Sequence, residues 1–116
     1  MRDAWLELDD TLKQRVRVVL DDPERLVTEA ELRKLSEEGR GMSRILGAEL
    51  QRLEQHLAEL DSDPASPFGA IGPAFRRVHD FREHLAELDG LLTELEDRAR
   101  QVRTSRLMES ALRPLD

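Results

Sequence analysis

The sequence contains no cysteine and no tyrosine, and its aromatic residues are one tryptophan and three phenylalanines. Without cysteine the chain has no disulfide, no thiolate metal ligand and no cysteine nucleophile. It also lacks any apolar run near the roughly 20 residues that a membrane-spanning helix needs. The first ten residues, MRDAWLELDD, do not contain the apolar core of a secretory signal. We therefore expect a soluble cytoplasmic protein.

The composition predicts an all-α protein. Strands favour β-branched and aromatic residues, whereas this chain is rich in Leu, Glu, Arg and Ala, which favour helices. Its 116 residues predict one domain, 1–116. The net charge is −7, which disfavours nucleic acid and anionic membranes as partners. Nearly all basic residues are Arg, with Lys only at Lys13 and Lys34, as expected from a GC-rich, bacterial coding bias.

The N-terminal segment predicts a first helix over about 3–20. Apolar residues recur there at steps of three and four, the spacing of one helix face. Pro23 follows Asp21 and Asp22, and proline cannot continue a helix. We expect the buried stripe to consist of Trp5, Leu8, Leu12, Val16 and Val19.

A second helix is predicted over about 29–60. Thr28 and Glu31 have the spacing of a capping box, which satisfies amide groups at a helix start. Two glycines, Gly39 and Gly41, then interrupt the pattern. In a continuous helix they would cost roughly 2 kcal/mol relative to alanines. We therefore expect the helix to be kinked or broken at Gly39–Gly41.

Residues 61–73 predict a connector, because they contain three of the five prolines. A long helix is predicted over about 74–112, with apolar residues alternating at steps of three and four from Val78 to Val102. Together, the pattern predicts an N-terminal helix packed on a long antiparallel helical hairpin that resembles a coiled coil.

The hexapeptide HLAELD occurs twice, at His56–Asp61 and at His84–Asp89. The copies lie 28 residues apart (56 to 84), which is four heptads, so both keep the same helical phase. The leucines then fall on the helix seam and both histidines lie beside it. We interpret the repeat as a packing pattern; the alternative is a ligand motif built twice.

The sequence offers little for a metal site or a catalytic site. A di-iron bundle needs Glu-x-x-His, but the residues three before the histidines are Leu53, Arg76 and Phe81. The reverse order, as in His84-x-x-Glu87, is typical of solvated ion pairs. No glycine-rich phosphate loop is present. We expect no enzyme activity, no catalytic residue, no metal, no cofactor and no small-molecule ligand.

The leading hypothesis is a non-enzymatic helical adaptor, scaffold or regulatory subunit that binds another protein. The apolar seam of the last helix is longer than the short first helix can cover. An uncovered apolar stripe is typical of an interface. We therefore expect a homodimer. The predicted interface consists of Leu85, Leu88, Leu92, Leu95 and Val102, with Phe68 and Ile71 in the connector.

The alternative hypothesis is a dimeric DNA-binding transcriptional regulator. Residues Leu32–Leu46 could form a helix, a glycine turn and a recognition helix, as in helix-turn-helix proteins. The DNA-contacting residues would then be Arg40, Ser43 and Arg44. The acidic charge of the chain disfavours this reading, although an acidic surface is also compatible with mimicry of nucleic acid.

Overall fold

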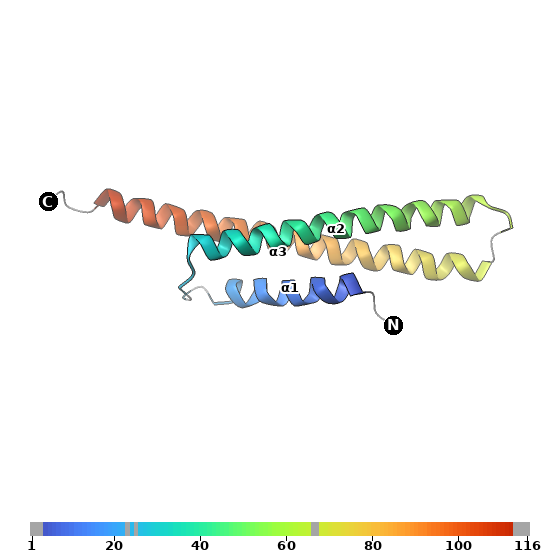
Figure 1. The fold of residues 1–116 in the computed structure, drawn as a ribbon, viewed down its shortest axis with the longest axis horizontal. Helices are drawn as coiled ribbons and strands as arrows, with labels where there is room; N and C mark the ends of the chain where they lie inside the picture. The colour runs from blue at the N-terminus through green and yellow to red at the C-terminus, as the bar shows by residue number, and fades with distance from the viewer. Residues whose placement is uncertain (1–3, 23, 25, 66–67, 113–116) are drawn as a thin grey trace.

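Three helices make up the fold. The computed structural model describes residues 4–22, 24, 26–65 and 68–112, which form α1 (Ala4–Leu20), α2 (Glu29–Ser62) and α3 (Phe68–Leu112), with no strand among them. Figure 1 shows α2 and α3 as a long antiparallel hairpin, with α1 alongside part of it. The molecule is a rod of 80 × 23 × 15 Å. The predicted all-α architecture is confirmed.

The two hairpin helices differ in length. At 1.5 Å per residue, the 34 residues of α2 span about 51 Å and the 45 residues of α3 about 68 Å. Arg106 of α3 pairs with Glu29, the first residue of α2, at 2.9 Å. Residues Leu107–Leu112 therefore continue beyond the start of α2 (Figure 1). We call them the projecting segment.

The core is built almost entirely from leucine and valine, with one phenylalanine. Burying each such side chain contributes roughly 1.5–3 kcal/mol. The core residues come from all three helices, so the rod has one continuous apolar interior. They are Leu6, Leu12, Val16, Val19, Leu32, Leu35, Leu46, Leu53, Val78, Phe81, Leu88, Leu92 and Leu95.

The buried face of α1 differs from the predicted one. Leu12, Val16 and Val19 are buried as expected, but Trp5 and Leu8 are exposed. The start of the helix is rotated so that Leu6 and the charged residues Asp9 and Lys13 face the hairpin instead. The prediction counted only apolar residues, and a buried ion pair on the same face escapes such a count.

Of the two alternatives expected at Gly39–Gly41, a kink or a break, the break is excluded, because α2 runs through both glycines as one helix. Gly39 is buried, and a Cβ atom placed there would overlap Cδ2 of Leu92 in α3. The glycine thus allows the two helix backbones to approach closely. Gly41 has open space around it. The turn that a helix-turn-helix motif needs is therefore missing from this region.

The connector is also shorter than predicted. It comprises residues 63–67 instead of 61–73, and α3 begins at Phe68 instead of near residue 74. Pro73 lies inside α3. It removes one hydrogen bond, the one residue 73 would donate to the carbonyl of Gly69, close to the helix start. The sequence pattern was interpreted with proline as a helix stop, whereas α3 continues through Pro73 in its second turn.

Candidate functional site

A charged pair is buried where α1 packs against the hairpin. Asp9 and Lys13 are one turn apart in α1, and their side chains are 0% and 1% exposed. The Lys13 Nζ atom lies 2.6 Å from Asp9 Oδ2. Charged side chains are almost never fully buried unless they are paired. The pair is therefore the most unusual chemical feature of the rod.

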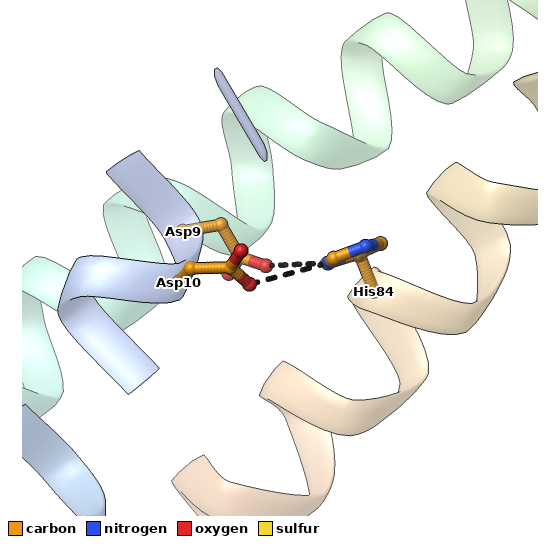
Figure 2. Close-up of side chains that lie close together, drawn as sticks. All are labelled: Asp9, Asp10 and His84. Carbon is orange, nitrogen blue, oxygen red and sulfur yellow. Dashed lines mark hydrogen bonds and ion pairs between the residues drawn. The ribbon is translucent and has the colours of Figure 1, made fainter. Parts of the chain in front are cut away.

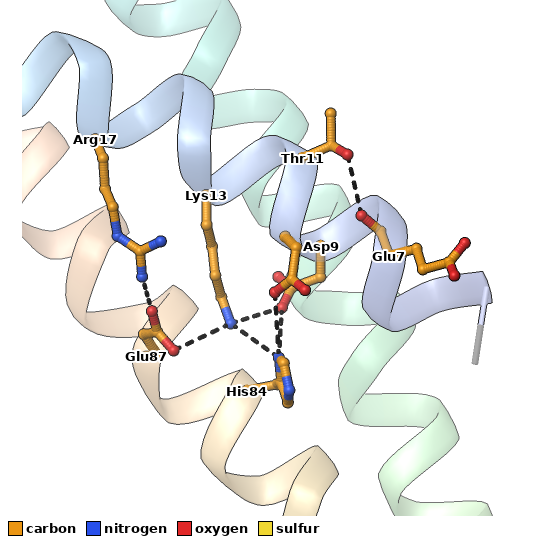
Figure 3. A network of polar contacts seen from close by, with 8 residues as sticks. Glu7, Asp9, Thr11, Lys13, Arg17, His84 and Glu87 are labelled. Atoms are coloured by element: carbon orange, nitrogen blue, oxygen red, sulfur yellow. Dashed lines mark hydrogen bonds and ion pairs between the residues drawn. The ribbon is translucent and has the colours of Figure 1, made fainter. Parts of the chain in front are cut away.

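Two residues of α3 complete this cluster (Figure 3). His84 Nδ1 lies 3.3 Å from Asp9 Oδ2 and 3.4 Å from Lys13 Nζ. Glu87 Oε2 lies 3.7 Å from Lys13 Nζ, and its other oxygen pairs with Arg17. The second HLAELD copy therefore supplies the α3 side of this charged cluster.

Asp9, Asp10 and His84 also have the composition of a metal-binding group (Figure 2). One ligand atom from each lies within 4.8 Å of the others. Asp9 Oδ1 is buried and accepts no hydrogen bond from the described residues. The ammonium group of Lys13, however, already lies beside Asp9 Oδ2 and His84 Nδ1, and it would repel a divalent cation. We interpret the cluster as an ion pair that fixes α1 on the hairpin.

The two HLAELD copies occupy different surroundings. His84 is half-buried under α1, whereas His56 is exposed on α2. The leucines behave more alike: Leu57 and Leu85 are both partly buried against the core, and Leu88 is fully buried. The shared helical phase therefore predicts the burial of the leucines correctly. It does not predict the burial of the histidines, because only the second copy lies next to α1.

The predicted interface residues lie mostly inside the single chain. Leu88, Leu92 and Leu95 belong to the core, and Leu85 and Val102 pack against it. The seam is covered because α2 is one continuous helix that follows α3, so the expected uncovered stripe is absent from these positions. In the connector region, Ile71 is half-buried in α3, and the side chain of Phe68 lies outside the described part.

Two of the three candidate DNA-contacting residues make contacts across the hairpin. Arg40 forms an ion pair with Glu96 of α3, and the Ser43 hydroxyl donates to Asp89 Oδ1 at 2.8 Å. Arg44 is exposed on α2. Arg40 and Ser43 therefore join α2 to α3, and each faces a carboxylate.

Two of the open grooves on the rod lie one towards each end of it. The tip groove, about 420 Å³, is lined by Leu57, Ala58, Ile71 and Phe75, with charged residues at its rim. The end groove, about 330 Å³, lies between α1 and α2. Sequence analysis identified Ile71 but missed the end groove, which depends on how α1 rotates. The apolar residues of the end groove are Val18, Val19, Val27, Leu32 and Leu35.

Neither the helices nor the comparisons with known proteins assign a function. No helix in the described part of the chain combines the length and the apolar character needed to cross a membrane. The sequence matches no protein-family model, no curated protein and no solved structure. The functional proposal therefore rests on the surfaces of the rod itself.

Proposed function

We propose that this chain is a non-enzymatic helical adaptor of the cytoplasm, which binds another protein through the tip groove. Its partner would supply an amphipathic helix that packs against α2 and α3 at the hairpin tip. A helix docking in an apolar groove is a recurrent mode of protein recognition, read through apolar residues at steps of three and four.

The observation that carries this proposal is the exposure of Phe75. Its side chain is 60% exposed, although phenylalanine is among the residues most often buried. It borders the tip groove next to Ile71 and opposite Leu57. Aromatic side chains in such a position are typical anchors of protein interfaces.

The arrangement of the helices explains why the groove is open. The ion pairs of α1 with the hairpin involve Glu38 in α2 and His84 and Glu87 in α3, none of which lines the tip groove. Figure 1 shows only α2 and α3 at the tip. A helix from another protein would lie where a bundle normally has its third helix.

Charged residues at the rim suggest the orientation of the partner. Arg82 and Glu54 form an ion pair with each other across the groove at 3.1 Å, so neither requires a charged side chain from the partner. Asp61, at the same groove, forms no ion pair with the described residues. A basic residue at the edge of the partner's apolar face would therefore match this end. Such rim contacts set orientation more than affinity.

The proposal is tested by photo-crosslinking in cells. A photoreactive phenylalanine analogue at position 75 should form an adduct with one defined protein. The same analogue at Gln101, an exposed position far along α3, is the matched control and should not capture that protein. The substitution Phe75→Asp should abolish co-purification of the identified partner while leaving helical content unchanged. If the partner still binds the Phe75→Asp variant, the tip groove is not its site.

A further inference from the structure

Exposed apolar side chains gather at the end of the rod opposite the tip. The described residues include nine large apolar side chains that are exposed, and five of them lie at this end. Leu26, in the connection between α1 and α2, is 98% exposed, and Leu112 is 79% exposed. Apolar residues concentrated in one place are typical of an interaction surface. The five are Val18, Leu26, Leu107, Met108 and Leu112.

These residues form two complementary shapes. No other helix of the described residues lies beside the projecting segment, because α2 begins opposite Arg106. Leu107 and Met108 on it are 56% and 58% exposed. The end groove, between the last turns of α1 and the first turns of α2, has an apolar floor and no helix over it. Each molecule thus has an uncovered apolar helix, the projecting segment, and an open apolar groove, the end groove, in which a helix could pack.

We infer that the occupant of the end groove is the projecting segment of a second copy of this chain. A chain cannot fill its own groove in this way, because α3 is a continuous helix that points away from the rod (Figure 1). Two copies related by a two-fold axis at this end would place each projecting segment on the groove of the other. In such a two-fold symmetric dimer the same two surfaces meet twice, and no surface is left to bind a third copy.

The charges at the two surfaces agree with this pairing. In the end groove Arg15 is bound to Glu38, which leaves Glu31 and Lys34 without ion pairs among the described residues. On α3, Arg106 is bound to Glu29. Near the end of that helix, Arg103 and Glu109 are likewise without ion pairs among the described residues. Each surface therefore offers one acid and one base to the other.

This self-association uses the end groove and is separate from the binding of another protein at the tip groove. It extends the proposed adaptor function, because the chain itself becomes one of the partners. It also replaces the dimer seam predicted from the sequence, whose leucines lie in the core. In the resulting dimer the two tip grooves face opposite directions, and the adaptor would hold two partner molecules far apart.

The mass in solution, measured by light scattering across a range of concentrations, tests this inference. The wild-type chain should have twice its 13.3 kDa mass. The double substitution Leu107→Asp and Met108→Asp should give the single-chain mass with unchanged helical content, because both side chains are exposed in the single chain. The Phe75→Asp variant should remain a dimer and serves as the control, since it alters only the tip.

A cross-link between two copies tests the geometry. The chain has no cysteine, so single cysteines can be introduced without interference. A copy with Val18→Cys, mixed with a differently tagged copy with Leu107→Cys, should form a disulfide between the two copies. A wild-type chain that stays at the single-chain mass would overturn the inference. A dimer that persists in the double Asp variant, or that forms no such disulfide, would equally overturn it. None of these results affects the test at position 75.

Discussion

Gly39 of α2 lies directly against Leu92 of α3, with no room for a side chain between them. A Cβ atom at position 39 would lie 3.3 Å from the Leu92 Cγ atom and would overlap its Cδ2 atom. Leu92 is only 3% exposed, so its side chain cannot move into solvent. This contact sets how closely the two hairpin helices approach.

The substitution Gly39→Ala should destabilise the protein. Overpacking a core typically costs about 1–3 kcal/mol, while replacing glycine by alanine in a helix recovers about 1 kcal/mol. We expect a net loss of up to about 2 kcal/mol in the free energy of unfolding, measured by urea denaturation.

Gly41→Ala provides the matched control. It lies two residues away in the same helix, and a Cβ atom there would meet nothing within 4 Å. This variant should be more stable than wild type by about 0.5–1 kcal/mol, because only the helix propensity changes. Equal effects at both positions would show that the close approach to Leu92 is absent.

These two glycines show what the sequence could not predict. Periodicity correctly predicted three helices and a hairpin, and the spacing of Thr28 and Glu31 correctly predicted the start of α2, where the Thr28 hydroxyl accepts from the Glu31 amide at 3.1 Å. It could not tell a glycine that breaks a helix from one that admits a neighbouring helix. The difference depends on Leu92, which is 53 positions away (39 to 92). Helix propensity describes only the chain near each residue.

The buried charged pair of α1 was missed in the sequence for a related physical reason. Apolar spacing placed Trp5 and Leu8 in the buried stripe of α1, but the structure buries Asp9 and Lys13. The available signal was the i,i+4 spacing of opposite charges, which is common on solvated helices. Only the position of His84 and Glu87 on α3 distinguishes this pair from a surface pair.

The tip groove was predictable in part, because the apolar residue Ile71 lies beside prolines.

The substitution Lys13→Met should strongly destabilise the protein. It removes the ammonium group 2.6 Å from Asp9 Oδ2 and leaves this fully buried carboxylate with only the His84 imidazole beside it. Removing one partner of a buried pair typically costs about 3–5 kcal/mol. The loss should appear in thermal and urea denaturation.

The double variant Asp9→Leu and Lys13→Met separates the charge effect from packing. Replacing both members of a buried pair with apolar residues of similar volume is often neutral or stabilising. We expect stability close to that of wild type. If Lys13→Met alone is as stable as wild type, the pair is not buried in solution, and α1 does not pack on the hairpin as described.

The Thr28→Ala variant should lose about 1 kcal/mol of stability, the usual effect of removing an N-cap side chain. Thr28 precedes α2, and its hydroxyl satisfies an amide that has no partner within the helix. Thr28→Asp should retain stability, because a carboxylate also caps the helix and interacts favourably with its dipole. Thr104→Ala, at an exposed position inside α3, is the control and should cause no loss.

Leu92→Glu and Leu107→Glu distinguish a core position from a surface position on the same helix. Leu92 lies in the core of the single chain, so a glutamate there buries a charge with no partner. We expect that variant to lose helical content and to show no cooperative thermal transition by circular dichroism. Leu107 is 56% exposed, so Leu107→Glu should keep the helical content of wild type. If Leu92 instead belonged to a seam between two copies, its glutamate variant would be a folded, helical single chain. That result would show that the core described for α2 and α3 forms only between molecules.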